Sequence, residues 1–492
     1  MRACLLALAA AAVSGGTPII DAMRADPLSF APASLRGRLA GHAAVAPPPA
    51  RAAAAAYGAR CSPLDNGGDP LGAKDSAPAI NACVAQCVNY SLLLDPLGHF
   101  PGDDSFGNGK FIANAGGCHI DLGGGEWLLS SPVLIPQFLG NLVLGHGSLV
   151  ADDTPGVFPV GGFLLVVGVE GSCQVPQGSC NVDLAFPELF LDGRNVASGM
   201  QVNAVMGTTV GPAFYALNFT LFGIQVNGGH EVMVDRAWLG ESNFDYQWTH
   251  ANPPKSVAIQ LNGNDHYVLN TVVFSSKVGL EVNGAANRID GVHVWFPYNQ
   301  ALAFEKEGVM AFHITSGQNR MTGCYIDGSR AVFEGNGLTN NVWLSGFECC
   351  ADVAGVAHGI ELLGDTVGPG LTISQNQFRG GTIFSTPITA GATVTVLGAL
   401  IAGNAFTGGG VGTRAALTLS QSATTSWSFD FCDRLVFPVI ARVAVSVVAA
   451  SGFPHAVARP PVGCTVLVET DAPVTGNITV EVDSSAISAD FV

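Results

Sequence analysis

The feature that most constrains the fold is a short phrase that recurs between residues 223 and 348. Each copy has an aliphatic pair, Asn-Gly, a polar residue and then alternating apolar residues that end on an aromatic; GIQVNGG, AIQLNGN and GLEVNGA are three openings. Their asparagines are Asn227, Asn262 and Asn283, at steps of 35 and then 21 residues. Repeats of this length cannot bury a face alone, so they indicate a stacked architecture.

Other positions repeat at the same interval. His266 and Asn287 are 21 residues apart, and Asn319 and Asn341 are 22 apart. Within each copy the apolar residues alternate with period two, which indicates strands and not helices. Short strands with Gly and Asn at the corners, at about 21 residues per coil, predict an all-β fold: a right-handed parallel β-helix, that is, a single-stranded solenoid.

The flanking segments differ in composition. Residues 1–16 have a basic start, an apolar run and small residues, the pattern of a secretory signal peptide too short to span a membrane. Residues 17–60 are rich in Ala and Pro and predict a flexible leader. The apolar stretch from Val436 is broken by Pro438 and Arg442 and alternates like a strand, so no membrane span is expected.

The β-helix is expected over residues 61–420, with a cap at each end. Ser76 as N-cap and Pro78 in the first turn predict a short amphipathic helix, which suits the exposed core of a solenoid end. Residues 421–492 alternate in longer runs and predict a small C-terminal β unit.

Charge and cysteine content restrict the function. Lys and Arg total 21 against 38 Asp and Glu, a formal charge of −17, which argues against nucleic acid as a partner. It also means that a polyanionic substrate would need a local basic patch. Twelve cysteines suit an exported, disulfide-bonded chain; without Cys4 an odd number remains, so at least one thiol is free or pairs with another molecule.

The cysteine spacing suggests particular pairs. Cys432 with Cys464 would staple the C-terminal unit, Cys173 and Cys180 bracket a small loop, and the adjacent Cys349 and Cys350 cannot easily pair with each other. No zinc-finger spacing is present. Sequons at Asn89, Asn218 and Asn477 permit glycosylation in a eukaryotic source.

Several stretches resemble known families. GGDPLGAKDSAPAI resembles the N-terminal signature of the pectate-lyase-like (pectin lyase-like) β-helix superfamily. GGHEVMV, NGNDHYVLNTVVFSSKVGLEVNGAANRIDGVHVW, QNRMTGCYID and FPHAVARPPVGCTVLVETD resemble the Quartet-type polygalacturonase family of plants, so the likeness spans about residues 61–485. This resemblance implies a secreted protein that acts on galacturonan in the cell wall.

The chain departs from the motifs of well-studied polygalacturonases. It has no Asn-Thr-Asp and no Arg-Ile-Lys. Gly145-His146-Gly147 followed by Asp152-Asp153 is present, but in reversed order and before the repeats, so we interpret it as a strand corner.

Glycosidic hydrolysis needs one carboxylic acid to protonate the leaving oxygen and one carboxylate to activate water or to attack. On a β-helix these groups would project from successive coils, which suggests Asp265, Asp290 and Asp327 as catalytic residues, with His293 orienting a carboxylate. Each also has a structural interpretation, since Asp and Asn at coil corners commonly bond the backbone.

Other side chains are candidates for binding. The predicted substrate-binding residues are Arg288 and Arg320 for a sugar carboxylate, His266, and Trp295 and Trp248 for stacking on sugar rings. No cofactor or metal is expected. The acidic loop with Asp235, Glu241 and Asp245 is a calcium alternative that lacks regular calcium-loop spacing.

The sequence thus predicts a secreted, extracellular, polysaccharide-active protein that hydrolyses pectin-like polymers with paired carboxylates. A polysaccharide lyase and a non-catalytic carbohydrate-binding or structural β-helix remain open alternatives, and oligomeric state is not predicted.

Overall fold

The structure is a computed structural model. It describes residues 58–94, 112–159, 161–169, 181–240, 256–296, 309–335, 339–349, 359–364, 366–367, 370–380, 387–391, 394–396, 398–406, 411–437 and 439–484. The predicted signal peptide and almost all of the predicted leader lie outside these residues.

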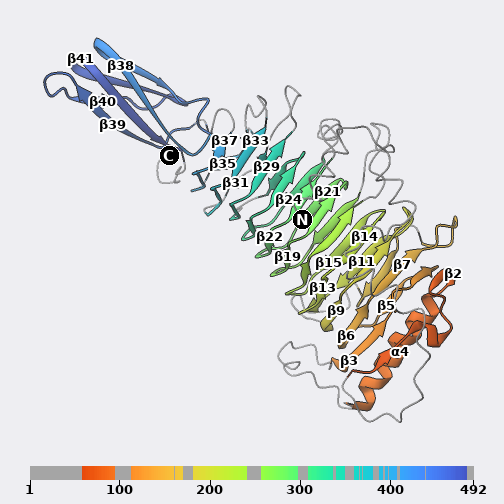
Figure 1. Cartoon of the computed structure of the whole chain (residues 1–492). Coiled ribbons are helices and arrows are strands. Elements are labelled where there is room, and N and C mark those ends of the chain that lie inside the picture. The colour runs from red at the N-terminus through yellow and green to blue at the C-terminus, as the bar shows by residue number, and fades with distance from the viewer. Residues whose placement is uncertain are drawn as a thin grey trace. The chain divides into compact units, whose positions relative to one another are not determined.

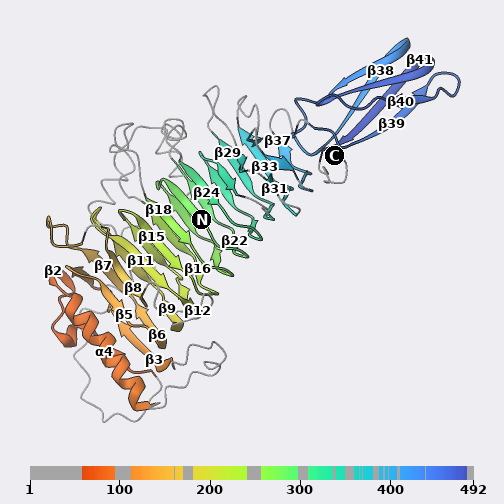
Figure 2. The same cartoon turned by 180° about the vertical axis from the view of Figure 1, so that it is seen from behind.

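The described chain winds through three parallel sheets, which confirms the predicted right-handed parallel β-helix (Figure 1, Figure 2). Sheet 1 contains, in spatial order, β1 (Arg60–Cys61), β3 (Ala113–Asp121), β6 (Leu139–Gly145), β9 (Asn181–Phe186), β13 (Thr209–Val210), β16 (Met233–Asp235), β19 (Tyr267–Leu269), β22 (Arg288–Asp290), β25 (Arg320–Thr322), β28 (Asn341–Trp343), β32 (Thr372–Ser374) and β36 (Leu400–Ala402), with β12 (Val205–Met206) paired to β9.

Sheet 2 contains β2 (Leu71–Asp75), β4 (Glu126–Leu129), β7 (Gly147–Ala151), β10 (Leu189–Asp192), β14 (Phe214–Leu217), β17 (Ala237–Gly240), β20 (Val272–Phe274), β23 (His293–Trp295), β26 (Tyr325–Asp327), β29 (Gly346–Cys349), β33 (Gln377–Gly380) and β37 (Ala405–Phe406). Sheet 3 contains β5 (Val133–Ile135), β8 (Phe163–Val167), β11 (Ser198–Asn203), β15 (Phe222–Asn227), β18 (Val257–Leu261), β21 (Val278–Val282), β24 (Met310–Ile314), β27 (Ala331–Glu334), β30 (Ile360–Leu363) and β34 (Ile388–Ala390). A separate pair joins β31 (Thr366–Val367) to β35 (Thr395–Val396).

Each coil runs from sheet 3 to sheet 1 to sheet 2. Because side chains alternate across a strand, every second residue enters the core: Ile259 and Leu261 of β18, Val268 of β19 and Val273 of β20 are all completely buried. The period-two pattern of the sequence is therefore the inward and outward alternation of each strand.

The corner between sheets 1 and 2 is tight, and one residue in each coil turns it with positive φ. Asn270, for example, lies between β19 and β20 with φ 49°. The column comprises His146, Glu188, Ala213, Arg236, Asn270, Gly291, Gly323, Leu344, Gln375 and Gly403. His146 separates β6 from β7 in this column, so the interpretation of Gly-His-Gly as a strand corner is confirmed.

A buried ladder of polar side chains follows the corner between sheets 3 and 1. The backbone N–H of His266 donates to Asn287 Oδ1 (2.9 Å), that of Asn287 to Asn319 Oδ1 (2.9 Å), and that of Asn319 to Asn340 Oδ1 (2.8 Å). The predicted match of His266 with Asn287 is confirmed. The match of Asn319 with Asn341 is wrong by one residue: Asn341 belongs to β28, where it pairs in register with Arg320.

The N-terminal end of the solenoid is covered by α4 (Ala77–Leu94), as predicted. The Ser76 carbonyl accepts from Ile80, which is the N-cap position, but its hydroxyl accepts from the Asp69 N–H. The side chain of Asp75 instead accepts from Ala77.

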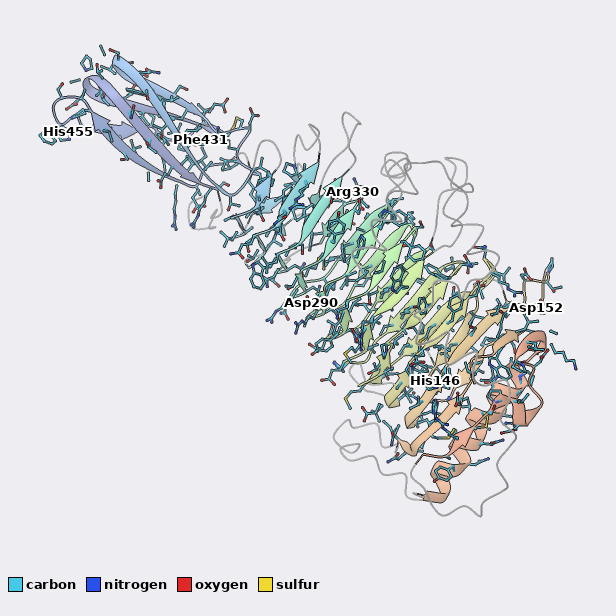
Figure 3. All side chains as sticks on the ribbon, in the orientation of Figure 1. His146, Asp152, Asp290, Arg330, Phe431 and His455 are labelled. Atoms are coloured by element: carbon cyan, nitrogen blue, oxygen red, sulfur yellow. A yellow bond between two sulfur atoms is a disulfide. The ribbon has the colours of Figure 1, made fainter. Side chains whose placement is uncertain are left out.

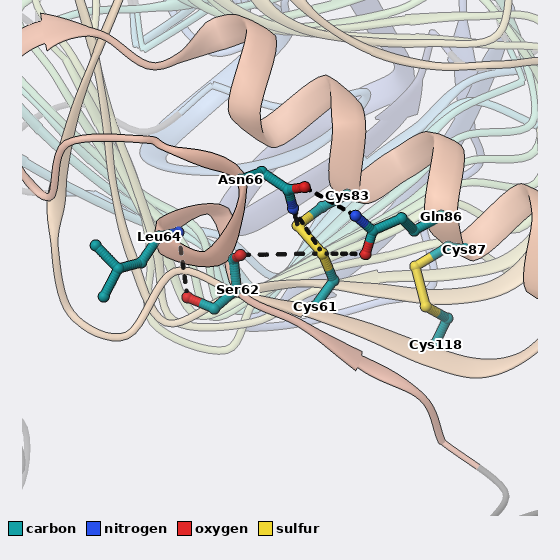
Figure 4. Close-up of a disulfide and its surroundings, with 8 residues drawn as sticks. All are labelled: Cys61, Ser62, Leu64, Asn66, Cys83, Gln86, Cys87 and Cys118. Atoms are coloured by element: carbon teal, nitrogen blue, oxygen red, sulfur yellow. Dashed lines mark hydrogen bonds between the residues drawn. A yellow bond between two sulfur atoms is a disulfide. The ribbon is translucent and has the colours of Figure 1, made fainter. Parts of the chain in front are cut away.

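Two disulfides attach this helix to the first strands of sheet 1. Cys61–Cys83 joins β1 to α4, with η2 (Pro63–Asn66) between them, and Cys87–Cys118 joins α4 to β3. The Asn66 amide lies 3.3 Å from both sulfurs of the first disulfide and accepts from Gln86 (Figure 4).

The C-terminal unit is a four-stranded antiparallel sheet of order β38-β41-β39, with β40 also paired to β41. Its strands are β38 (Arg414–Asp430), β39 (Arg442–Ala449), β40 (Ala456–Ala458) and β41 (Thr465–Asp483). The unit starts a little before the expected boundary at residue 421, has its own core, which includes Trp427, and contains the predicted Cys432–Cys464 disulfide.

Of the remaining cysteines, Cys324 is a buried free thiol whose pKa burial raises to about 12. The predicted Cys173–Cys180 pair lies outside the described residues. In the part of the chain that the structure describes, no helix is both long and apolar enough to cross a membrane.

Candidate functional site

A row of polar side chains runs along the outer face of sheet 3. In successive coils Gln201 Nε2 donates to Gln225 Oε1 (2.9 Å), Gln225 Nε2 to Gln260 Oε1 (2.7 Å) and Gln260 Nε2 to Glu281 Oε2 (2.8 Å). A carboxylate only accepts hydrogen bonds, so an ionised Glu281 requires the Gln260 amide to present its NH₂ group. By the same argument, Gln225 and Gln201 each present their NH₂ group to the next coil, and Glu281 accepts the last bond between these four side chains.

A second row of amides lies beside the first. Asn227 donates to Asn203 (3.1 Å), Asn262 to Asn227 (2.8 Å) and Asn283 to Asn262 (2.9 Å). The predicted equivalence of Asn227, Asn262 and Asn283 is thereby confirmed. Asn262 also donates to Gln260 Oε1 (3.0 Å), so the two rows hold each other in place.

The Gln row continues into a histidine between two carboxylates. In the coil after Glu281, His313 of β24 places Nδ1 4.0 Å from Glu281 Oε1 and Nε2 3.0 Å from Glu334 Oε2. The His313 and Glu281 side chains are 18% and 22% exposed, whereas that of Glu334 is 54% exposed. The outer face of sheet 3 thus offers two carboxylates on either side of one imidazole.

An arginine and a third carboxylate extend this face. Arg330 Nη1 lies 3.2 Å from Glu361 Oε2, and both side chains are about four-fifths buried, at 18% and 21% exposure. We call Glu281, His313, Arg330, Glu334 and Glu361 the sheet 3 site. Figure 3 shows Arg330 and Asp290 on opposite edges of the ribbon.

The longest connections of the central coils all join sheet 2 to sheet 3. Residues 241–256, 296–309 and 350–359 separate β17 from β18, β23 from β24 and β29 from β30. We expect insertions in a solenoid to gather on one side, often the binding side. Their C-terminal ends return the chain to β18, β24 and β30, next to the sheet 3 site.

The predicted residues on sheet 1 form a separate group. Arg288 and Arg320 are exposed neighbours in register on β22 and β25. Asp290 is on β22, where its Oδ2 accepts from Arg288 Nη2 at 2.8 Å. The structure therefore brings the two predicted arginines together, and it pairs Asp290 with one of them.

Asp265 and His266 lie at the corner between sheets 3 and 1. Asp265 has a positive φ of 60° and a half-exposed side chain. His230 Nδ1 lies 3.5 Å from Asp265 Oδ2. His266 is completely buried, and its Nδ1 accepts from the Val232 N–H. Burial lowers its pKa to about 3, and nearby His230 contributes. This burial argues against the predicted contact of His266 with substrate.

The remaining predicted residues lie on sheet 2. Trp295 and Asp327 are in register on β23 and β26, and Glu348 of β29 follows Asp327. The Tyr325 ring lies tilted against that of His293, with ring centroids 4.9 Å apart, and the Tyr325 hydroxyl donates to Glu348. Burial lowers the pKa of His293, and burial, followed by the Glu348 bond, raises that of Tyr325.

The predicted catalytic residues thus lie on two sheets and one corner. Asp265, Asp290 and Asp327 do not converge on one face, and their catalytic roles stay predictions. Trp248 lies outside the described residues, as do Glu241 and Asp245 of the calcium alternative. Asp235 of that alternative bonds Arg236 at 2.8 Å.

The sheet 3 site was missed although its signal lies in the repeated phrase. Two places before each corner asparagine stand Gln225 in IQVNG, Gln260 in IQLNG and Glu281 in LEVNG. The equivalent place in the next coil, FHITSG, is His313. Aligning the coils on this outward position, and not on the asparagines alone, would have found the row.

The fold defines the class: the chain is a right-handed parallel β-helix protein. No family model matches it. It is 27% identical to the polygalacturonase QRT3 of Arabidopsis thaliana over 460 residues, which are 90% of this chain and 88% of that protein. The resemblance to Quartet-type polygalacturonases is thus confirmed.

Solved structures resemble the fold at low sequence identity. ORF18 of Geobacillus virus E2 matches with a TM-score of 0.52 and 11% identity, over 85% of this chain and 77% of that one. The endo-xylogalacturonan hydrolase of Aspergillus tubingensis matches with a TM-score of 0.44 and 11% identity, over 71% and 93%. At these identities the likeness concerns fold, and the second fit is too loose to carry an argument.

Proposed function

We propose that this protein is a secreted glycoside hydrolase of galacturonan-type cell-wall polymers and that the sheet 3 site is its catalytic surface. The observation that carries this proposal is the placement of His313 between the carboxylates of Glu281 and Glu334. Hydrolysis of a glycosidic bond needs two carboxyl groups on one surface, and these two share a face.

The two carboxylates have different surroundings. Glu281 is held by Gln260 and faces His313, so its orientation is fixed, and we assign it the activation of water. Glu334 is more exposed and shares a hydrogen bond with His313. We assign Glu334 the delivery of a proton to the leaving oxygen, with His313 returning a proton after each cycle.

The spacing favours one stereochemical course. A carboxylate on each side of an imidazole suits the roughly 6.5–9.5 Å separation of an inverting pair better than the roughly 5–5.5 Å of a retaining pair. We therefore expect the newly released reducing end to have the anomeric configuration opposite to that of the bond cleaved, as observed by NMR early in the reaction.

Three observations support the substrate and location. The relative that spans 90% of the chain is named a polygalacturonase. Three disulfides among the described cysteines suit an oxidising, extracellular setting. Arg330 of the sheet 3 site lies 3.2 Å from Glu361, and an arginine can bind a sugar carboxylate bidentately.

The test is the release of reducing ends from polygalacturonate and from a panel of other polysaccharides. Glu281→Gln and Glu334→Gln should each lower kcat by about 10²-fold or more, with unchanged thermal unfolding. Asp290→Asn, on the opposite edge of the coil, is the matched control and should keep near-normal activity. If Asp290→Asn loses activity and the two Glu variants do not, the catalytic surface lies on sheet 1. If Asp327→Asn loses activity and the two Glu variants do not, it lies on sheet 2.

A non-catalytic carbohydrate-binding protein is the second candidate. The observation in its favour is the double row of amides on sheet 3, since side-chain amides offer donors and acceptors to sugar hydroxyls. Binding of a polymer without release of reducing ends would support this role. Release of an unsaturated product that absorbs in the ultraviolet would instead identify a lyase.

A further inference from the structure

A cluster of two histidines and an aspartate lies in the first coils, away from the sheet 3 site. One ligand atom from each of His119, Asp121 and His146 lies within 4.8 Å of the other two. His119 and Asp121 are on β3, and His146 is the corner residue that follows β6 in the next coil. We propose that these three side chains bind a Zn²⁺ ion that clips the first two coils together.

The separations suit a tetrahedral ion. Bonds of about 2.0–2.1 Å to imidazole nitrogen and carboxylate oxygen place ligand atoms roughly 3.3–3.5 Å apart. His146 Nδ1 and Asp121 Oδ1 are 3.7 Å apart, too far for a hydrogen bond and close to that value. The two imidazole rings meet edge to face with centroids 4.9 Å apart, and one nitrogen of each lies within 4.8 Å of the other and of an Asp121 oxygen.

The cluster also contains an unused ligand. Among the described residues, His119 Nε2 is buried and has no hydrogen-bond partner. A buried polar atom without a partner costs free energy, which a bound ion would remove. Two imidazoles with one carboxylate form a donor set typical of zinc with a water in the fourth position, whereas calcium prefers an all-oxygen shell.

The backbone holds the ligands from two coils. Asp121 is in register with Gly145, and its Oδ1 also accepts from the Gly123 N–H at 3.0 Å. His146 has φ 63°, which fixes its side chain at the corner. An ion here would tie β3 to the corner between β6 and β7, close to the α4 cover.

One neighbour opposes a cation. Arg60 Nη1 lies 3.8 Å from Asp121 Oδ2, with an arginine side chain that is 69% exposed. A nearby positive charge weakens cation binding, so removing it should tighten binding by about threefold, a modest effect because solvent screens the charge. Replacement of Arg60 is therefore expected to strengthen Zn²⁺ binding, whereas replacement of a ligand should weaken it.

The experiment is calorimetric titration of Zn²⁺ into chelator-treated, tag-free protein. We expect one ion per chain, and His119→Ala and His146→Ala should each weaken binding by more than tenfold, since even outer partners of a metal contribute roughly 10–100-fold. Asp121→Asn keeps the shape of the side chain and should also weaken binding, while Arg60→Ala should strengthen it. Saturating Zn²⁺ should raise the Tm of wild type by roughly 3 °C and leave that of His146→Ala unchanged.

His230→Ala is the matched control. His230 lies 3.5 Å from Asp265, a histidine–carboxylate pair like that of His146 and Asp121 but outside the cluster, and its loss should not change Zn²⁺ affinity. Absence of saturable binding in wild type would overturn the proposal. So would equal affinities in wild type and in a His146→Ala variant whose circular dichroism is native.

Discussion

Two ladders of side-chain amides run along this solenoid, one buried and one exposed, and they differ in the groups that they bond. In the buried ladder, each Asn oxygen accepts from the backbone N–H of the coil before it, as Asn287 does for His266. In the exposed ladder, Asn262 and its neighbours bond other side chains. The buried ladder satisfies backbone groups that have no other partner, whereas the exposed one orients polar groups that water could also satisfy.

The buried ladder should carry the largest effect on stability. Asn319→Ala removes the acceptor of the buried Asn287 N–H, which is then left unpaired, and one of the two amide donors to the Ser316 carbonyl, which keeps its bond from Asn340. We expect a loss of about 2–3 kcal/mol in the free energy of unfolding, measured by urea denaturation. Asn283→Ala in the exposed ladder is the control, and equal losses in both variants would remove the distinction.

The histidine of the buried ladder should make stability depend on pH. The pKa of His266 in the folded state, about 3, is below the ordinary value of 6.5, so between these pH values the unfolded state binds a proton that the folded state does not bind. Stability is therefore complete above pH 6.5 and is lost as pH falls toward 3.

His266→Asn places at this position the residue that the following coils use. Between pH 6.5 and pH 5, the free energy of unfolding of wild type should fall by about 2 kcal/mol more than that of the variant. Thermal unfolding at each pH measures this difference. Parallel pH profiles of wild type and variant would show that His266 is not the group responsible.

The exposed rows should affect activity more than stability. Gln260→Met removes the amide that orients Glu281 and leaves the core unchanged. Under the proposed function we expect kcat/KM to fall by roughly tenfold, or about 1.4 kcal/mol. Gln201→Met, two amides further along the row, serves as the control, and similar losses in both variants would mean that orientation of Glu281 is not the cause.

The smallest effect is expected for Asn262→Ala. Its partners Asn227 and Gln260 stay accessible to water, so the free energy of unfolding should change by no more than about 0.5 kcal/mol. A loss above 1 kcal/mol in the same denaturation assay would mean that the exposed ladder also supports the fold.

The sequence was sufficient for the scaffold because the scaffold repeats. Period-two alternation, the Asn-Gly corners and the 21-residue steps predicted the sheets, and local signals near Pro78 predicted α4. Coil length is less regular than the phrase suggests, because insertions stretch some steps. The step from Asn287 to Asn319 is 32 residues, and the mismatch of Asn341 by one residue shows how easily register is misassigned.

The candidate site is harder to find than the scaffold because its members are separated by those variable steps, so they align only when the outward position of each coil is compared. Glu281 and His313 are neighbours in space and 32 residues apart in the chain, and Glu334 follows 21 residues later. Asp290 and Asp327 are easy to recognise as candidates in the motifs RIDGVHVW and CYIDG. The strand that carries each residue, and the direction in which its side chain points, determine which face of the coil it belongs to.

The disulfide-held helix at the N-terminal end has a consequence for aggregation. β1, β2 and β5 are the outermost strands of their sheets, and an open strand edge is a template on which another chain can add. α4 covers this end, and Cys61–Cys83 and Cys87–Cys118 attach it covalently to β1 and β3. Reduction of both pairs would remove the covalent attachment of α4 to β1 and β3, so we expect another chain to add at these strand edges more readily in a reducing environment than in an oxidising one.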